Sequence, residues 1–549
     1  MKGPGSAGAG QEFTPKFVTV LREGYRWPDF RADILAGLTV AIVALPLAMA
    51  LGIASGASPR EGLITAVVAG FLISLLGGSR VQIGGPTGAF VVIVAGVIAA
   101  HGYAGLLLAM TMAGAILIFA GYAGVGRLMR FIPMPVVTGF TAGIAVIIAS
   151  SQIGDLLGLA AGNPPVEFVA KWIAYLRALG TINWVSAGLW IAALALILLL
   201  RRYVPRLSPY LVAIIAGTAA AAAFGLPVET VGQRFPAMPS GLPMPSLPAV
   251  SFDLAREVMP SAFVIAFLAG IEALLSATVA DGMTGRRHRS GQELVGMGVA
   301  NIVSAAVGGL PATGAIARTA TNIRAGGRTP VAGMAHAVFL LLFMLVAGDL
   351  LALVPMTVLA AVLLMVAWGM SESDRFVALL RVDAGERALL ILTFLLTVFV
   401  DLTVAIGVGV TLAALMFMHR MSEQAGMVAA DITEDPELRA QLPADVEVFR
   451  FTGPMFFGVA SEMLEGLRRL GQRPRAVILR MEGVPYVDST GAHALETFVR
   501  QAKASGTEVW LCGLRRQPLE FLARQGTRFA GARRGLTWEG TLKRVVAGG

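Results

Sequence analysis

The chain has 549 residues, of which 56% are hydrophobic and only 14% are charged. Because soluble proteins carry roughly 25% charged residues, this composition excludes a soluble multidomain enzyme and a disordered chain. The formal net charge of +9 does not indicate nucleic-acid binding in so apolar a chain, since cytoplasmic loops of membrane proteins are also rich in Lys and Arg. We therefore expect a polytopic membrane protein with no nucleic-acid partner.

Few residues of this chain offer metal or covalent chemistry. The single cysteine, Cys512, excludes an intrachain disulfide, and the five histidines are scattered along the sequence. No GxxxxGK loop occurs, so nucleotide hydrolysis has no support. We expect no metal site, no cofactor and no enzymatic activity.

Fourteen apolar stretches are expected to cross the membrane, because about 20 apolar residues span a bilayer. Two of them are short, begin with Gly and Pro, and have the form of half-helices: residues 87–100 and 314–323. The other twelve are residues 33–55, 60–77, 104–122, 134–153, 184–200, 209–225, 258–280, 291–308, 330–347, 351–369, 386–400 and 402–419.

Loop charges predict the orientation of these stretches. With the N-terminus inside, the inner loops hold many more arginines than the outer loops, among them Arg127, Arg130 and Arg206, as the positive-inside rule requires. Residues 1–30 lack the apolar stretch of a signal peptide and are expected to be a cytoplasmic segment. From the loop charges we expect both ends to be cytoplasmic. Arginine greatly outnumbers lysine, a bias typical of GC-rich bacterial genomes, so we expect the protein to lie in the inner membrane of a bacterial cell.

The apolar region, expected over 31–425, contains two similar copies, about 31–225 and 256–420. GFLISLLGGSRVQIGGPTGAF at 70–90 recurs loosely as GVANIVSAAVGGLPATGAIA at 298–317. A proline-rich outer loop at 226–250 joins the copies. Each copy holds seven stretches, an odd number, so the second copy must be inverted in the membrane. Inverted repeats with interrupted helices predict a secondary transporter whose site lies between the interrupted helices.

The two interrupted helices predict an anion site. Gly84-Gly85-Pro86-Thr87-Gly88 precedes one helix and Pro311-Ala312-Thr313-Gly314 precedes the other. Unpaired N–H groups and the helix dipole favour an anion at each start. The alternative is that both segments are ordinary loops between tightly packed helices.

Two ionisable residues fall inside the predicted spans near these starts. Arg318 follows the second start, and a cation there costs at least ~2.5–3.5 kcal/mol unless it is paired or hydrated. A bound anion would relieve that cost, and the alternatives are a structural carboxylate pair or snorkelling to the cytoplasm. Glu272 would gain and lose a proton during transport, or form a permanent ion pair with Arg318. Ser276, one turn further along, would add a hydroxyl. Asp155, Asp349 and Asp401 are interpreted as helix caps or interface residues.

The chain becomes polar after Arg420. Residues 445–549 show strand and amphipathic helix patterns of a small α/β domain, with strands at 446–449, 476–481 and 508–513 and a helical face between Met463 and Leu470. Residues 426–444, including the acidic DITEDPE at 431–437, are the expected linker. VDSTG at 487–491 places Asp488 or Ser489 at a helix N-cap.

These motifs resemble the SulP (sulfate permease) family of anion transporters with a C-terminal STAS domain. The resemblance rests on motifs that occur in the expected order: FRADILAGLTVAIVALPLAMALG at 30–52, GGPTGAF at 84–90, FLAGIEALLSATVADGMTGRRHRSGQEL at 267–294, GGLPATGAIARTATNIRAGGRTP at 308–330, FRFTGPMFFGVA at 449–460 and VDSTGAHAL at 487–495.

The resemblance implies seven-plus-seven inverted repeats arranged as core and gate domains, a homodimer, and an elevator-like motion of the core. Glu272 then corresponds to the acid that is linked to proton or sodium coupling. Ser489 corresponds to the serine that is phosphorylated in anti-sigma-factor antagonists, and the STAS domain would bind a soluble partner. The implied substrate-lining residues are Thr87, Gly88, Ala89, Phe90, Ala315, Ile316, Ala317, Arg318 and Thr319.

The sequence departs from the family pattern at three polar positions. Leu47 and Leu51 replace a glutamine and a tyrosine of many members, and Ala317 replaces a serine. A less polar pocket around Leu47 favours a carboxylate or dicarboxylate such as fumarate over sulfate, with bicarbonate also open.

We therefore expect proton-coupled symport of a small anion. The alternatives are an uncoupled exchanger or channel, a sodium-coupled symporter, a nucleobase permease, and a membrane-anchored regulatory scaffold.

Overall fold

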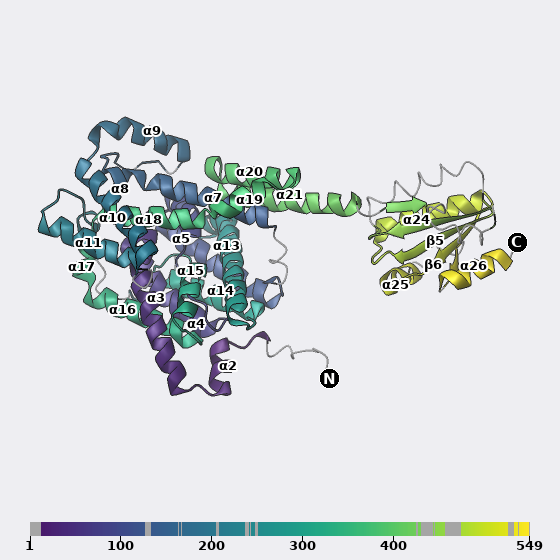
Figure 1. The fold of residues 1–549 in the computed structure, drawn as a ribbon, viewed down its shortest axis with the longest axis horizontal. Coiled ribbons are helices and arrows are strands. Elements are labelled where there is room, and N and C mark those ends of the chain that lie inside the picture. Colours follow the sequence, from purple (N-terminus) through teal and green to yellow (C-terminus); the bar gives the residue numbers. More distant parts are fainter. Residues whose placement is uncertain are drawn as a thin grey trace. The chain divides into compact units, whose positions relative to one another are not determined.

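The computed structural model contains two compact units, Met1–Val410 and Thr411–Gly549 (Figure 1). The structure describes residues 12–126, 133–162, 164–165, 167–204, 208–236, 241, 243–246, 251–423, 426–429, 443, 445–455, 474–524, 532–535 and 537–547. Several predictions fall outside these residues, namely those on Arg127, Arg130 and Arg206, on the acidic stretch 431–437, and on the helical face between Met463 and Leu470.

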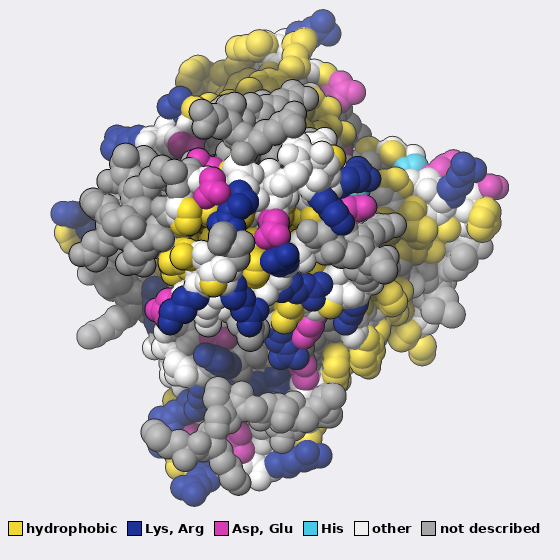
Figure 2. Space-filling view, turned by 90° about the vertical axis from the view of Figure 1, so that its right-hand side faces the viewer, with side chains coloured by type: hydrophobic (Ala, Val, Ile, Leu, Met, Phe, Trp, Pro, Cys, Tyr) yellow, Lys and Arg dark blue, Asp and Glu magenta, His cyan; other side chains and the backbone are white. Residues whose placement is uncertain are grey.

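Long apolar helices dominate the first unit. Within the described residues, eight helical segments are long and apolar enough to cross a membrane: Trp27–Ala54, Pro59–Leu76, Gly88–Tyr122, Met134–Leu157, Trp184–Tyr203, Phe252–Thr284, Met356–Leu379 and Leu402–Arg420. Two shorter apolar helices are Pro209–Ala223 and Pro330–Val346. Large hydrophobic side chains reach the surface over broad areas (Figure 2), as a bilayer-facing surface requires. The predicted class, a polytopic helical membrane protein, is confirmed.

The first interrupted helix ends where the sequence predicts a break. Helix α5 (Val91–Tyr122) follows the short 3-10 helix η1 (Gly88–Phe90) and is interrupted at Gly102, which has φ 68° and ψ −177°. Glycine adopts this backbone conformation without the Cβ clash of other residues. The stretches 87–100 and 104–122 are therefore two separate helical segments.

Seven helices form one packed group, which we call the core group. From the first copy come α3 (Trp27–Ala54), α4 (Pro59–Leu76) and α5; from the second come α13 (Phe252–Thr284), α14 (Ser290–Ala306), α15 (Ile316–Arg324) and α16 (Pro330–Val346). The packing is reciprocal, since α3 and α4 contact α16 while α13 and α14 contact α5. This reciprocity is what two copies of one motif, related by an approximate two-fold axis, produce.

A second set of helices, which we call the gate group, packs mainly within itself. Its members are α7 (Met134–Ser151), α8 (Ile153–Leu157), α10 (Trp184–Tyr203), α11 (Pro209–Ala223), α18 (Met356–Met370) and α20 (Ala384–Phe399). Short helices accompany these groups: α2 (Lys16–Glu23), α9 (Phe168–Ala178), η2 (Leu179–Thr181), α12 (Val231–Arg234), α17 (Gly348–Ala352) and α19 (Ser373–Leu380). Helix α21 (Leu402–Glu423) follows α20 and crosses the division between the two units.

The three acidic residues interpreted as caps lie at helix ends. Asp155 and Asp349 stand in the first turns of α8 and α17. Asp401 accepts a hydrogen bond from the amide of Thr403, 2.6 Å away, at the start of α21. Asp155 also forms an ion pair with Arg234 at 2.8 Å. Asp401 therefore caps a helix, Asp155 pairs with an arginine, and Asp349 lies in a first turn, so all three stand at helix ends as expected.

The second unit is an α/β domain built on a mixed sheet. Across its described residues the strand order is β3 (Gly426–Ala429), β4 (Val446–Thr452), β5 (Ala476–Gly483), β6 (Glu508–Cys512) and β7 (Ala532–Gly535). Strand β3 is antiparallel to β4, and the other pairs are parallel. The three predicted strands appear as β4, β5 and β6. The stretch 426–444, expected as linker, begins with strand β3.

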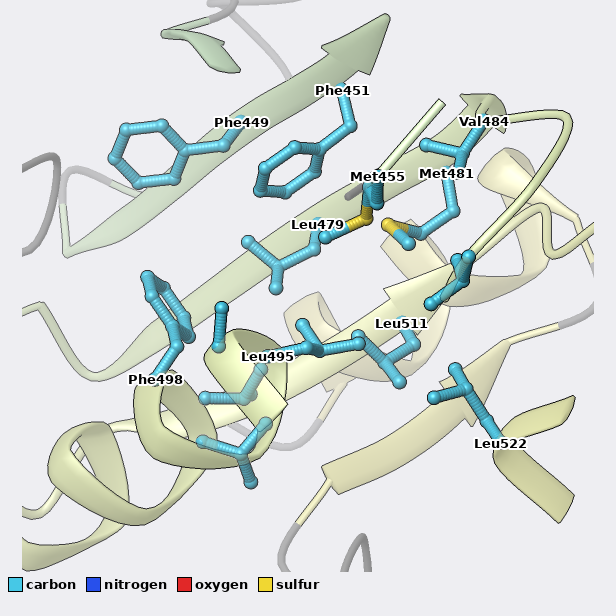
Figure 3. Close-up of a cluster of buried hydrophobic side chains, with 14 of the residues drawn as sticks. Phe449, Phe451, Met455, Leu479, Met481, Val484, Leu495, Phe498, Leu511 and Leu522 are labelled. Atoms are coloured by element: carbon cyan, nitrogen blue, oxygen red, sulfur yellow. The ribbon is translucent and has the colours of Figure 1, made fainter. Parts of the chain in front are cut away.

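Helices cover both faces of this sheet. On one face, α24 (Ser489–Ala504) and α25 (Arg516–Arg524) bury Leu495, Phe498 and Leu522 against Phe451 and Leu479 (Figure 3). On the other face, α26 (Trp538–Ala547) buries apolar side chains against β4, β5 and β6. Successive residues of β5 alternate between the two clusters because side chains of a strand point to opposite faces.

Candidate functional site

The two half-helix starts lie side by side in the core group. Strand β1 (Gly84–Gly85) pairs antiparallel with β2 (Thr313–Gly314), and this two-residue pairing brings residues of both copies together. The amide of Ala315 donates to the carbonyl of Ile83 at 2.8 Å, which extends the pairing. Both helices begin within a few residues of this crossing, at η1 and at α15. The two segments thus contact each other directly, and the anion site at their helix starts stays a prediction.

Glycine is required where the two strands cross. Gly85 has φ 148°, and a Cβ atom there would lie 2.6 Å from Nη1 of Arg318. A Cβ on Gly314 would overlap the side-chain amide of Gln82. The glycines allow the backbones and the Arg318 side chain to approach each other more closely than other residues would permit.

Arg318 is the cation of this site. It lies in the first turn of α15, is only 5% exposed, and donates from Nη2 to the carbonyl oxygen of Pro86. Its Nη1 is buried without a hydrogen-bond partner. The side chain therefore reaches across the crossing instead of snorkelling to the membrane surface. A buried guanidinium N–H without a partner is costly unless an anion or water occupies the space beside it.

Glu272 approaches the same crossing from α13. Its half-buried carboxylate accepts a hydrogen bond from Oγ1 of Thr87 at 2.9 Å. Glu272 and Arg318 both belong to the described residues, and they form no ion pair within 4.0 Å. The permanent ion pair that the sequence left open is thus absent from this structure, and each charge has a partner from the first copy.

Two hydroxyl groups link α13 to α15. Oγ of Ser276 lies 3.2 Å from Oγ1 of Thr319, and Thr319 accepts a hydrogen bond from the amide of Ile83 at 3.0 Å. Ser276 and Thr319 are both buried. In this structure they link α13, α15 and the segment that precedes η1.

The remaining predicted residues supply backbone and apolar surface. The amides of Ile316, Ala317 and Arg318 are the first three of α15, whose N-cap Ala315 provides no side-chain acceptor. Other residues of the predicted site differ in exposure: at the two starts Ala89, Phe90 and Ala315 are buried while Ile316 and Ala317 are exposed, and Leu47 is a half-buried residue of α3.

The structure adds gate-group residues that the sequence did not single out. A Cβ atom on Gly88 would lie 3.1 Å from the methyl group of Met370 and 3.3 Å from Cδ1 of Ile148. Met370 ends α18 and Ile148 belongs to α7, so the gate group closes over the start of η1. Nothing in the sequence marks these two apolar residues within apolar helices.

Buried amide side chains support the crossing from behind. Asn301 donates to the carbonyl of Ala312 and accepts from the amide of Ala312, both at 2.9 Å. Asn322 donates to the carbonyl of Val81 at 2.8 Å. Gln82 is buried with both of its amide atoms unpartnered. A polar residue inside an apolar span is the signal that would have marked Asn301.

Metal binding has no support in the described part of the chain, where no group of three or more His, Cys, Asp or Glu residues is placed to hold an ion. The site is instead made of one buried cation, helix N-termini, a carboxylate and apolar side chains. Helix N-termini beside a cation favour a negatively charged group at this place.

Comparison with known sequences identifies the family. Residues 30–393 match the profile of the sulfate permease family, and residues 437–529 match that of the STAS domain. The chain belongs to the sulfate permease family. It is a multi-pass membrane transporter with a C-terminal STAS domain, as the motifs predicted.

Individual relatives cover nearly the whole chain. The putative sulfate transporter YvdB of Bacillus subtilis is 39% identical over 510 residues, which are 92% of this chain and 95% of YvdB. The bicarbonate transporter BicA of Picosynechococcus is 32% identical over 505 residues, 88% of this chain and 89% of BicA.

Solved structures support the fold. The transmembrane domain of a cyanobacterial BicA is 30% identical, with a TM-score of 0.62, and covers 71% of this chain and 98% of that domain. Murine Slc26a9, solved as an anion transporter in the inward-facing state, matches with a TM-score of 0.87 over 100% of this chain and 96% of that chain. At 18% identity, the murine likeness shows the fold alone.

Proposed function

We propose that this protein is a secondary active transporter of a small anion, which binds between η1 and α15. The observation that carries the proposal is the unpartnered Nη1 of buried Arg318, beside the uncapped first turn of α15. Both features favour a negative charge at the same place. A chain that only anchored a STAS domain in the membrane would have no use for a buried, half-satisfied cation.

The proposed substrate class is a carboxylate or dicarboxylate, with fumarate as the example. One guanidinium N–H and a few backbone amides suit a planar carboxylate, while the apolar surfaces of Leu47, Phe90 and Met370 suit a carbon skeleton. Bicarbonate shares the planar carboxylate-like group, and the bicarbonate transporter BicA is a relative. Sulfate, suggested by the name of YvdB, has four oxygens to satisfy and finds few hydroxyl groups here.

Glu272 is the proposed coupling residue. Its carboxylate accepts a hydrogen bond from Thr87, a residue of the proposed anion site, and has no ion pair with Arg318. A proton on Glu272 would remove a negative charge beside the entering anion, so protonation and anion binding favour each other. Sodium at the same carboxylate is the alternative coupling ion.

The proposed motion is elevator-like, with the core group sliding against the gate group. Support comes from the packing, since the whole crossing belongs to the core group while Met370 and Ile148 approach it from the gate group. We place the protein as a homodimer in a bacterial inner membrane, with the STAS domain in the cytoplasm. Ser489, exposed beside the N-cap Asp488, is the proposed phosphosite through which a soluble partner would regulate transport.

Uptake of labelled fumarate, bicarbonate, sulfate and chloride into proteoliposomes tests this function, with and without an inside-alkaline pH gradient. We expect one carboxylate-type anion to accumulate, and a protonophore to abolish the accumulation. Glu272→Gln should abolish gradient-driven accumulation and leave some anion exchange. The matched control is Glu257→Gln, on the same helix but 62% exposed, which should accumulate anion normally.

Three outcomes would contradict parts of the proposal. Normal accumulation by Glu272→Gln would remove the coupling role. Uptake that follows a sodium gradient, or ignores both gradients, would replace proton symport by sodium symport, exchange or a channel. Failure of every anion to enter would reject the transport function itself.

A further inference from the structure

An open pocket lies at one end of the core group, away from the crossing. Its volume is about 510 Å³, and its polar lining includes Arg26, Arg80, Arg286 and Arg328 together with Glu23 and Asp29. These residues come from the end of α2, the start of α3 and the turn between them, and from the loops that follow α4, α13 and α15. Four separate segments thus contribute arginine or acid to one pocket.

The positive charge of this pocket is only partly neutralised. Arg80 forms an ion pair with Glu23 at 2.5 Å, and Arg328 forms one with Asp29 at 3.0 Å. Arg286 donates to the carbonyl oxygen of Arg328 at 3.2 Å. Among the described residues, neither Arg286 nor Arg26 forms an ion pair within 4.0 Å, although the Glu23 carboxylate is near enough to feel the charge of Arg286. Two guanidinium groups of the pocket therefore lack a directly paired carboxylate.

The wall of the pocket is held in place from within the protein. Asp33 is fully buried and accepts hydrogen bonds from the hydroxyl of Tyr25 at 3.0 Å and from the amides of Arg328 and Thr329 at 2.7 and 3.1 Å. Tyr25 and Thr329 also line the pocket. The carboxylate of Asp33 accepts hydrogen bonds from these donors and, within the described part of the chain, forms no ion pair with Arg26 or Arg286. It therefore holds the pocket wall in place without neutralising either arginine.

Exposed apolar residues of α2 and α3 follow and precede the pocket residues along the chain. Trp27 is 74% exposed and stacks on Phe30 with ring centroids 5.2 Å apart, and Leu21 and Leu35 are also exposed. Tryptophan is enriched in the headgroup region of a bilayer, where positively charged loop residues also gather on the cytoplasmic side. In the topology proposed above, this end of the core group faces the cytoplasmic leaflet.

We propose that this pocket binds a phosphate group, and that the group is the headgroup of an anionic membrane lipid. Guanidinium groups bind phosphate oxygens in a bidentate manner, and two of them are uncommitted here. The neighbouring aromatic and leucine side chains would contact the acyl chains of the same lipid. The bound lipid would hold the α2–α3 turn against the loops that follow α4, α13 and α15. This inference does not depend on the transported substrate.

Binding of lipid to the full-length protein in detergent tests the proposal. Native mass spectrometry would count short-chain phosphatidylglycerol bound per protein, with short-chain phosphatidylcholine as the neutral comparison. Arg26→Ala and Arg286→Ala should each weaken phosphatidylglycerol binding about fivefold, or ~1 kcal/mol, and the double variant about 25-fold. Arg22→Ala and Arg287→Ala are matched controls, because both residues are exposed neighbours outside the pocket and should change binding less than twofold.

Competition with inorganic phosphate and glycerol phosphate separates a lipid from a soluble ligand. If neither competes at the same concentration, the membrane supplies the occupant. One of the two competitors could displace the lipid and itself bind more weakly to the Arg26→Ala/Arg286→Ala variant. That result would support a phosphate site but overturn the lipid as its occupant, in favour of a soluble phosphate compound. Binding of phosphatidylglycerol that is equal in the double variant and the controls overturns the site. A double Lys variant at these positions should retain most of the binding, which distinguishes charge from folding.

Discussion

Arg318 and Pro86 are joined by one of several hydrogen bonds that link the two copies of the repeat. The guanidinium of Arg318, from the second copy, donates to the carbonyl oxygen of Pro86 in the first copy and leaves Nη1 free. The contact fixes the cation between the two helix starts without neutralising it, because a carbonyl carries only a partial charge. The protein thus keeps a full positive charge available for a mobile ligand.

Replacing Arg318 by Met should remove most of the affinity for the anion. Hydrogen bonds to charged groups contribute about 1.5–3 kcal/mol, so the half-saturating anion concentration should rise roughly 10- to 150-fold. Arg318→Lys should give an intermediate loss, since an ammonium group keeps the charge but not the planar fork. Initial uptake rates over a range of anion concentrations measure both effects.

The control for Arg318 lies on the same helix. Arg324 is exposed at the end of α15, and Arg324→Ala should change the half-saturating concentration less than twofold. An Arg318→Met protein that folds, inserts and transports with unchanged affinity would show that backbone amides bind the anion alone.

Gly85→Ala should disable transport by a steric route. The added methyl group would meet Nη1 of Arg318 at 2.6 Å, and the φ of 148° is strained for any residue with a Cβ, by about 1–3 kcal/mol. We expect uptake to fall more than about tenfold, with a lower thermal midpoint in detergent. Gly96→Ala is the matched control, because a Cβ there meets nothing within 4 Å. Equal uptake by the two variants would mean that the crossing opens more freely than the structure indicates.

Much of the membrane fold could be predicted because lipid imposes simple rules. The apolar stretches of span length predicted most of the helices. The loose internal repeat, with glycine and proline at two half-helices, predicted that residues 84–90 and 308–319 lie close together. Helix α9 was missed although its exposed apolar residues, Val169, Trp172, Ile173 and Leu176, follow helical spacing. A search limited to long apolar runs passes over an amphipathic helix of 11 residues.

The contacts within the site could be predicted less well. Two-residue strands such as β1 and β2 have no propensity signal, and their pairing depends on the inverted arrangement of whole repeats. The sequence left an ion pair between Glu272 and Arg318 open, whereas the hydrogen-bond donor to Glu272 is Thr87, 185 positions away. Opposite charges attract at many separations, so their presence in one region does not decide which pair forms.

Cys512 should report on the integrity of the STAS domain. This sole cysteine is fully buried at the end of β6, and burial raises the pKa of its thiol above the ordinary value of 9.0. Because the thiolate is the reactive form, maleimide labelling at pH 7.5 should be at least about tenfold slower than for Cys512→Ser/Ser505→Cys, which places a thiol at an exposed position. The raised pKa means that the folded state holds the thiol proton more tightly than the unfolded state does. The stability that this proton gives the fold is therefore complete below pH 9.0 and is lost as the pH rises through the pKa of the folded state. Denaturant should therefore release rapid labelling of Cys512 in step with unfolding. Rapid labelling of the native full-length protein would instead show that β6 is accessible and that the apolar cluster between the sheet and α26, to which Cys512 belongs, opens readily.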